Sequence, residues 1–295
     1  MVIIRISEHV IQLGNRHFNY FIIGQEEAAV IECGVTGGVV SLSQQWTQWE
    51  TPPPIRYLIA SHAHFDHVCG IPALRELFPE ASVLASAEAN KILGKTKIVK
   101  NFFVQDEKMS AVLAAEGILE GIPVSPNPET IKVDQVIGEG GEIHLGGGLK
   151  LRIIGAPGHS PCSLAFYLPQ EQVMFVSDSG GFQISDDRLF PIFFQGYELY
   201  QETLRRLRGF PTRVLAIPHE RIWVQGDVQA FYNRAIKTAQ DAYANIEMML
   251  DNGLDDEAIK RNLFSYYYQG NLRIYTAENI TTCVDLLVRR VKECL

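Results

Sequence analysis

The pattern of hydrophobic and polar positions predicts an alternation of strands and helices over the first third of the chain. Short β-branched and aromatic runs separated by turn residues predict strands over residues 2–6, 10–13, 18–24 and 28–32. A helical spacing follows from Thr36 to about Trp49 and ends at three prolines, 52–54. The same rhythm then predicts a strand over 57–60, a helix over 71–78, a strand over 82–85 and a helix opening near Ser86.

In the middle of the chain the alternation of strands and helices is interrupted, and the C-terminal part is predicted to contain helices without strands. A helical pattern over 96–119 and a loop with three prolines over 121–128 indicate a helical insertion at about 94–128. Strands are expected again over 131–136, 142–145, 149–155, 164–168, 173–177 and 214–217, with one helix over 197–208. From residue 228 the spacing is helical in three stretches, broken at Asn252-Gly253 and Gly270-Asn271. We therefore predict one layered α/β domain over 1–225 and a helical appendage over 226–295 packed on it.

Composition narrows the class of protein. The 295 residues are 46% hydrophobic with a mean hydropathy of +0.01, which is enough to bury a large core, and no apolar run approaches the ~18 residues that span a bilayer. The first six residues lack the features of a secretory signal, and the five cysteines are scattered, so a cytoplasmic protein with free thiols is expected. A net charge of −8 argues against binding to nucleic acid or to an anionic membrane. The oligomeric state cannot be predicted.

Candidate chemistry is concentrated in the segment Ser-His-Ala-His-Phe-Asp-His at 61–67. Side chains two apart in an extended segment project to the same side, so His62 and His64 can face one point. Asp66 and His67 follow as the chain enters the next helix, and the change of direction can aim them at a second point nearby. Four ligand-type side chains in six positions predict a metal site, and their arrangement makes two metals plausible.

Three further ligand candidates stand just beyond predicted strands. They are His159 in Ala-Pro-Gly-His-Ser, Asp178 in Val-Ser-Asp-Ser and His219 in Ile-Pro-His-Glu. A carboxylate between two imidazole-rich clusters is suited to bridging a pair of divalent cations, and Asp178 fits that role. The donor set suits zinc or iron, and manganese also fits. Glu32 and Glu220 are expected at most to orient a ligand or fix a loop, while His9, His17 and His144 are assigned no role at the metals.

With these residues in this order, the chain resembles the metallo-β-lactamase superfamily over about residues 1–225. The resemblance implies a four-layer αββα sandwich with the site at one edge of the two sheets. It also implies that one metal is held by His62, His64 and His159, the other by Asp66, His67 and His219, and that Asp178 bridges them. Within the superfamily the layout is most similar to that of the 2-aminobenzoylacetyl-coenzyme A thioesterases, which carry a similar helical insertion and helical C-terminus.

The expected activity is metal-dependent hydrolysis of a small ester. Two cations sharing a water lower its pKa to roughly 7, so a bridging hydroxide can attack a carbonyl, and Asp66 is the candidate catalytic residue that orients it. A thiolate leaves without a proton, so hydrolysis of a thioester such as an acyl-coenzyme A needs no general acid at this site. Among the aromatic residues that follow Asp178, we select Phe182, Phe194 and Tyr197 as candidate substrate contacts, although ordinary core packing is the simpler explanation for such residues.

Two other functions are compatible with the same motif. A persulfide dioxygenase would use one iron and leave Asp66, His67 and His219 partly idle. A signalling or regulatory protein would keep the metal site but act through its surface. The number of metal ions per chain separates the first from a hydrolase, and the effect of an Asp66→Ala variant separates the second.

Overall fold

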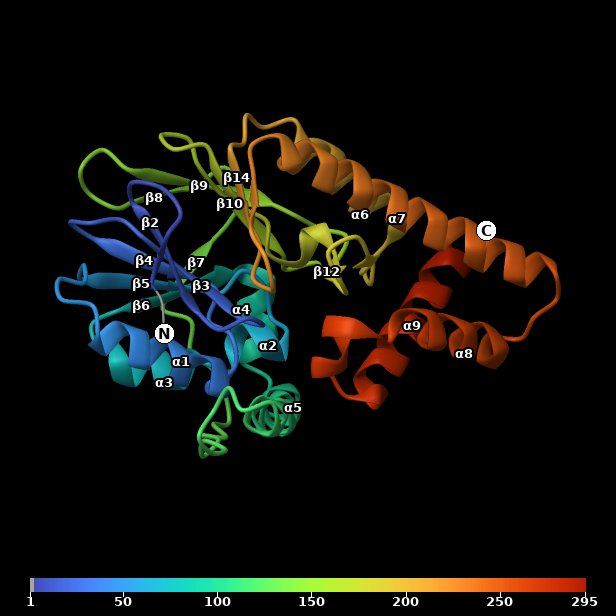
Figure 1. Ribbon diagram of the computed structural model, residues 1–295, viewed down its shortest axis with the longest axis horizontal. Helices are drawn as coiled ribbons and strands as arrows, with labels where there is room; N and C mark the ends of the chain where they lie inside the picture. Colours follow the sequence, from blue (N-terminus) through green and yellow to red (C-terminus); the bar gives the residue numbers. More distant parts are fainter. Residues whose placement is uncertain (1–2) are drawn as a thin grey trace.

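The computed structural model describes residues 3–295, which fold into two β-sheets packed face to face with helices on their outer sides (Figure 1). This arrangement is the αββα sandwich expected from the sequence. The helical C-terminal segment is also present, and it lies beside the edge of the sandwich where the candidate ligands gather.

The first sheet contains seven strands in chain order. Neighbouring strands are antiparallel from β1 to β4 and parallel from β4 to β7. The strands are β1 (Ile4–Arg5), β2 (Val10–Gly14), β3 (Asn19–Ile23), β4 (Ala28–Ile31), β5 (Ile55–Ile59), β6 (Ser82–Ser86) and β7 (Gln135–Ile137). The parallel strands therefore end at one edge, where β5 leads into the histidine motif.

The second sheet has the strand order β15-β14-β11-β10-β9-β8 and is antiparallel except for the parallel pair β11 and β14. Its strands are β8 (Glu142–His144), β9 (Lys150–Gly155), β10 (Leu164–Leu168), β11 (Val173–Phe175), β14 (Val214–Ala216) and β15 (Trp223–Val224). A separate two-stranded ribbon joins β12 (Phe182–Gln183) to β13 (Leu189–Phe190). Because β11 and β14 run in the same direction, the loops that follow them meet at one edge.

Alternating side chains on the central strands explain why the sheets pack on both faces. In β3, Phe21 and Ile23 face the opposite sheet, whereas Tyr20 and Ile22 belong to the core beneath the helices. The ring of Phe21 meets Phe175 of the second sheet at a centroid distance of 5.3 Å. All five residues of β3 are buried. A strand covered on both faces gains from apolar side chains on both faces, which is why residues 20–23 form a continuous apolar run.

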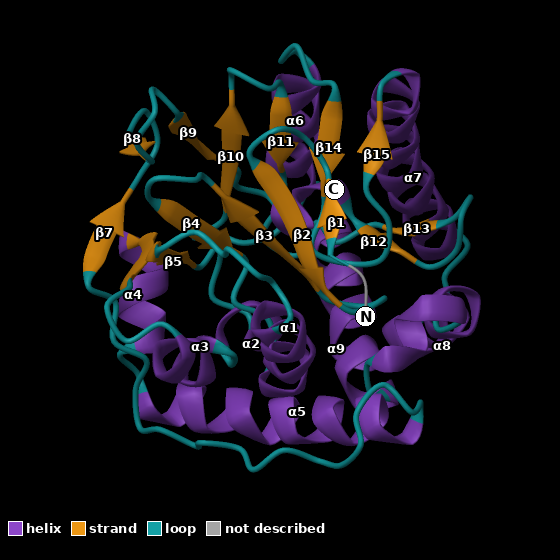
Figure 2. Ribbon diagram, turned by 60° about the vertical axis from the view of Figure 1, so that its left-hand side comes forward, coloured by secondary structure: helices purple, strands orange, loops and turns teal. Residues whose placement is uncertain are grey.

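Five helices cover the outer side of the first sheet and the ligand edge. They are α1 (Thr36–Thr47), α2 (Phe65–Val68), α3 (Ile71–Leu77), α4 (Ala87–Leu93) and α5 (Thr96–Ala115). Helix α4 begins at Ser86, whose hydroxyl accepts a hydrogen bond from the amide of Ala89 as an N-cap. The long helix α5, which was predicted as an insertion, lies across the ends of α1, α2 and α4 (Figure 2).

The remaining helices cover the second sheet and then turn back toward the site. They are α6 (Tyr197–Arg208), α7 (Gly226–Asp251), α8 (Asp256–Tyr267) and α9 (Ala277–Lys292), with 3₁₀ turns η1 (Ser177–Gly180) and η2 (Gly270–Ile274). Helix α7 packs on α6 and β15, and its far end leads through α8 to η2, which contacts both α5 and β12. The C-terminal helices and α5 thus approach one another across the ligand edge (Figures 1 and 2).

Several predicted boundaries were wrong. The strand expected over 131–136 begins only at Gln135, because the amide of Ile131 donates to the carbonyl of Leu93 at 3.0 Å instead of joining the sheet. The strands β12, β13 and β15 were missed, since two residues are too few to show a period. Of the strand expected over 2–6, the structure has Ile4–Arg5, and Val2 lies outside the described residues. None of the helices within residues 3–295 has the length and apolar content required to span a bilayer.

Candidate metal centre

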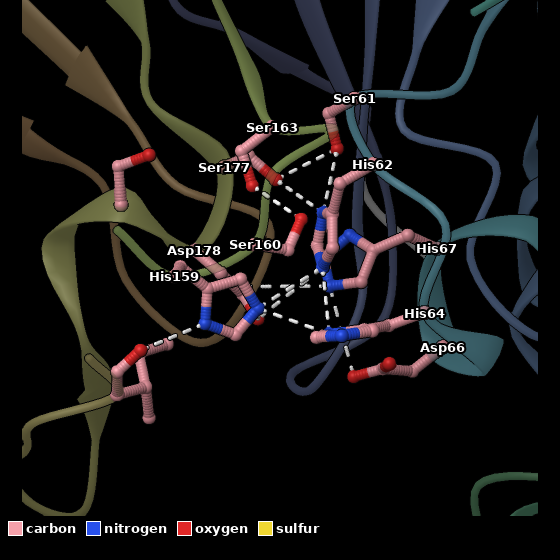
Figure 3. A network of polar contacts seen from close by, with 12 residues as sticks. Ser61, His62, His64, Asp66, His67, His159, Ser160, Ser163, Ser177 and Asp178 are labelled. Atoms are coloured by element: carbon pink, nitrogen blue, oxygen red, sulfur yellow. Dashed lines mark hydrogen bonds and ion pairs between the residues drawn. The ribbon is translucent and has the colours of Figure 1, made fainter. Parts of the chain in front are cut away.

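All seven predicted ligands come from loops or helix starts at the same edge of the two sheets. His62 follows β5, His64 is the N-cap of α2, and Asp66 and His67 occupy the first turn of that helix. The other three come from the second sheet: His159 from the turn after β9, Asp178 from η1 after β11, and His219 from the loop after β14. The structure brings them together in two groups that share Asp178. Figure 3 shows these side chains except His219.

The first group consists of three imidazole nitrogens. His62 Nε2 lies 3.1 Å from His64 Nδ1, His159 Nε2 lies 3.0 Å from the same His64 atom, and the two Nε2 atoms are 3.2 Å apart. Nitrogens bound to one tetrahedral ion at ~2.0–2.1 Å are separated by about 3.3 Å. The triangle therefore has nearly the size that a single cation requires.

The second group consists of Asp66, His67 and His219. His67 Nε2 lies 3.4 Å from His219 Nε2, and each of these nitrogens is 3.7 Å from Asp66 Oδ2. Two imidazoles and one carboxylate oxygen form a donor set that suits zinc, iron or manganese.

Asp178 lies between the two groups and turns one oxygen to each. Its Oδ2 is 3.5 Å from His159 Nε2 and 3.9 Å from His62 Nε2. Its Oδ1 is 3.4 Å from His67 Nε2 and 3.5 Å from His219 Nε2. This is the placement of a bridging carboxylate in a site for two cations.

Four of the candidate ligand histidines have a partner for the ring nitrogen that faces away from the group, which fixes the orientation of the ring; they are His62, His67, His159 and His219. His67 Nδ1 donates to Glu32 Oε2 at 2.7 Å, and the same oxygen accepts from Ser61 Oγ at 2.9 Å. His159 Nδ1 donates to the carbonyl of Ile192 at 3.0 Å, and His219 Nδ1 donates to that of His17 at 2.9 Å. The expectation that Glu32 orients a ligand agrees with these contacts.

Backbone strain accompanies this arrangement at three residues next to the ligands. Glu32, Ser177 and Glu220 have φ angles of 72°, 49° and 62°, a left-handed region that costs a non-glycine residue energy. Glu220 Oε1 in turn accepts from His17 Nδ1 at 2.7 Å, which ties the loop of His219 to the β2–β3 hairpin. Although His17 was assigned no role, its side chain supports this loop and its carbonyl orients His219.

The electrostatics of the two groups differ. Burial lowers the pKa of His64 to about 3 and keeps the pKa of His62 well below its usual range, with neighbouring imidazoles adding to both shifts. These rings are neutral, as ligands must be. Around His67 burial works in the same direction but is outweighed by Asp178, Asp66 and Glu32, which raise its pKa well above the usual range. The second group is therefore a place where a positive charge is favoured, and a bound cation would take the place of the proton.

A pocket of about 210 Å³ opens beside the two groups. His64, Asp66, His159 and Asp178 are among the residues that line it, together with side chains of α5, the β12–β13 ribbon and α9. Of the predicted substrate contacts, Phe182 and Phe194 line the pocket, and their rings also pack on His219 and His159. Tyr197 does not: at the start of α6 it packs on Tyr243 with a centroid distance of 4.4 Å, so its selection as a contact needs correction.

One residue of the site was not foreseen. Tyr275, between η2 and α9, lines the pocket, and its hydroxyl donates to Asp66 Oδ2 at 2.6 Å. Burial raises the pKa of this phenol well above its usual range, with the charges of Asp66 and Asp178 adding to the effect. No motif surrounds Tyr275, and its partner is 209 residues away in the sequence, so only the fold reveals the contact.

Comparison with known proteins places this centre in a family. The model of the family described as the metallo-beta-lactamase superfamily matches residues 14–219, a span that contains all seven candidate ligands. The probable metallo-hydrolase YqgX of Bacillus subtilis (strain 168) is 26% identical over 159 residues, which are 54% of this chain and 64% of that protein. The match thus spans less than two thirds of YqgX. The metallo-beta-lactamase fold-containing protein ST1585 of Sulfurisphaera tokodaii is 24% identical over 213 residues, 68% of this chain and 71% of that protein.

Solved structures agree on the fold. The crystal structure of ST1585 superposes with a TM-score of 0.60 and 20% identity, covering 97% of this chain and 99% of that one. The sec-alkylsulfatase Pisa1 of Pseudomonas sp. gives a TM-score of 0.65 at 14% identity, covering 98% of this chain and 50% of Pisa1. The similarity to the thioesterases stays a prediction. Because the family model matches residues 14–219, and because this span contains both ligand groups, the chain belongs to the metallo-beta-lactamase superfamily.

Proposed function

We propose that this protein is a metal-dependent hydrolase that cleaves a small ester, preferably a thioester, using two divalent cations. The observation that carries the proposal is Asp178, which presents one carboxylate oxygen to each ligand group. A mononuclear iron enzyme has no use for the second group, whereas a pair of cations uses every member of both.

When bound, a pair of divalent cations lowers the pKa of a shared water and polarises the carbonyl under attack. The residues of the chain supply the rest. Asp178 presents one oxygen to each group and would contribute a ligand to each cation. Asp66 lines the pocket with the other ligand residues, and its carboxylate can accept a hydrogen bond from the attacking water and orient it.

The walls of the pocket indicate the chemistry of the substrate. Among the described lining residues, charge is carried only by the ligand groups on the pocket floor, and no lysine or arginine takes part. The other polar members are neutral, among them Asn101, Gln105 and Asn279. A carboxylate, phosphate or sulfate in this space would have no cationic partner on the walls, while an uncharged apolar acyl group would be well accommodated.

The same walls favour a leaving group that needs no proton. Asn101, Gln105, Asn279 and Thr282 are not acids at neutral pH, and burial raises the pKa of the Cys283 thiol to about 12. An amine must be protonated to leave, whereas a thiolate departs as the anion. This is the reason for preferring a thioester, with the apolar acyl group in the pocket and the thiol portion directed outward.

The proposal is tested by metal analysis combined with a substrate panel. Purified protein is analysed for bound metals and then assayed with acyl-coenzyme A thioesters, simple esters, lactones, alkyl sulfates and phosphodiesters. We expect two ions per chain and the highest kcat/KM on a thioester, with Asp66→Ala lowering it at least 100-fold. A single iron per chain with oxygen consumption on a persulfide would instead identify a dioxygenase. Loss of hydrolysis in Asp66→Ala with an unchanged biological effect would identify a regulatory protein.

A further inference from the structure

We infer that Tyr275 is a positioning residue of the metal centre, which holds Asp66 toward the second cation and makes the C-terminal helices part of the active site. The inference rests on the proposed two-cation site. Tyr275 lies outside residues 14–219, the span that matches the family model, so it is not among the positions that the model describes.

The hydrogen bond involves the oxygen of Asp66 that matters for the metal. Tyr275 Oη donates at 2.6 Å to Oδ2, and Oδ2 is the atom that lies 3.7 Å from both His67 Nε2 and His219 Nε2. A carboxylate on the first turn of a short helix can rotate about its side-chain bonds. The phenol selects the rotamer in which Oδ2 faces the two imidazoles.

The position of the phenol is itself fixed from several sides. The ring of Tyr275 packs edge-on against Phe65 of α2 and Phe182 of β12, with centroid distances of 6.2 and 5.4 Å. Its backbone carbonyl accepts from the hydroxyl of Tyr268 at 2.9 Å, and its amide donates to the carbonyl of Leu272 at 3.2 Å. The side chain is 8% exposed. Because the ring is already fixed, its hydroxyl can orient the Asp66 carboxylate at little cost in side-chain entropy. Hydrogen-bond partners commonly orient metal ligands in this way.

The role of Tyr275 is therefore comparable to that of Glu32 on the other side of the second group. Glu32 orients His67 from the end of β4, and Tyr275 orients Asp66 from the C-terminal segment. The first group has no contact of this kind with the C-terminal helices: in the described structure the outward nitrogens of His62 and His159 meet Ser177 and Ile192. The loss of the Tyr275 hydroxyl should thus affect one cation and spare the other.

The test measures metal affinity in the absence of substrate. Tyr275→Phe removes only the hydroxyl, and Tyr167→Phe is the matched control, because its buried hydroxyl donates to the carbonyl of Pro211 at 2.6 Å away from the site. Metal-free forms of both variants and the unaltered protein are titrated with Zn²⁺ against a chromophoric chelator. We expect Tyr275→Phe to bind its second ion 10- to 100-fold more weakly, with the first ion unchanged, and Tyr167→Phe to match the unaltered protein.

A double-mutant cycle separates positioning from a general effect on folding. In an Asp66→Ala background, Tyr275→Phe should cause no additional loss of affinity, because the hydroxyl acts through the carboxylate that is missing. Additive losses, unchanged affinity in Tyr275→Phe, or a single ion in the unaltered protein would overturn the inference. Failure of every ester and thioester in the substrate panel would refute the proposed function alone, since the titration needs no substrate.

Discussion

The size of the pocket predicts how the rate should depend on the length of the acyl chain. An apolar protein cavity of ~150 Å³ admits benzene, which has six carbons. On the same scale, the 210 Å³ pocket beside the ligand groups has room for about eight carbons. Each methylene that moves from water into this space contributes about 0.8 kcal/mol, which corresponds to about a fourfold increase in kcat/KM.

The assay is a series of straight-chain acyl thioesters from two to twelve carbons, each at concentrations well below KM. We expect kcat/KM to rise about fourfold per methylene from the four-carbon to the eight-carbon chain and then to level off or fall. Cys283→Phe, which adds a ring to the pocket wall, should move the optimum to shorter chains. Cys294→Phe is the control, because Cys294 is exposed and does not line the pocket. A flat profile, or an optimum that Cys283→Phe leaves in place, would refute the assignment of this pocket to the acyl group.

Three further predictions concern the metal ligands and the insertion. Asp178→Asn should reduce metal content below two ions per chain and lower kcat/KM at least 100-fold, as elemental analysis and the same assay would show; retention of both ions would contradict the bridging role. Removal of metal with a chelator should lower the free energy of unfolding by about 2.7 kcal/mol relative to protein with metal at 100 times its Kd, and equal melting curves would argue against a built site. Burial raises the pKa of Asp106 on α5 from 3.8 to about 6, so its native form keeps a proton that the unfolded chain has lost between these values. The stability that this group contributes is therefore full below the unfolded pKa of 3.8 and is lower by about 3 kcal/mol once the pH has risen past 6. Urea unfolding at pH 4.5 and 7.5 should show about 2 kcal/mol of this loss in the unaltered protein and not in Asp106→Asn, whereas an equal change in the two proteins would exclude it.

The sequence was sufficient to predict which candidate side chains gather at one edge, because most of them stand at or just beyond the end of a strand. His62, His159 and His219 follow strands whose ends converge once the sheets pack face to face, so a correct strand assignment already places them at one edge. The alternation of strands and helices indicated an α/β domain, and the resemblance to the superfamily implied the four-layer sandwich.

The residues that were missed or misassigned depend on contacts that no local pattern encodes. Tyr197 is the first residue of α6 and Tyr275 lies between η2 and α9, and neither has a local pattern that indicates its partner. The packing of α6 against α7 brings Tyr197 to Tyr243, and the fold of the C-terminal segment brings Tyr275 to Asp66. Likewise, the strand near Ile131 was placed too early because a buried isoleucine in a loop has the same sequence signature as one in a strand. Hydrophobicity reports burial, whereas the partner of a hydroxyl or an amide is decided by tertiary structure.

The position of Tyr275 late in the chain has a consequence for biosynthesis. During translation the nitrogens of the first group are complete once His159 has been made, and the second group is complete at His219. The phenol that orients Asp66 follows 56 residues later, with the helices that carry it. A product that stops between these points, through a premature stop codon or proteolysis, would contain all seven ligands and still lack a full active site.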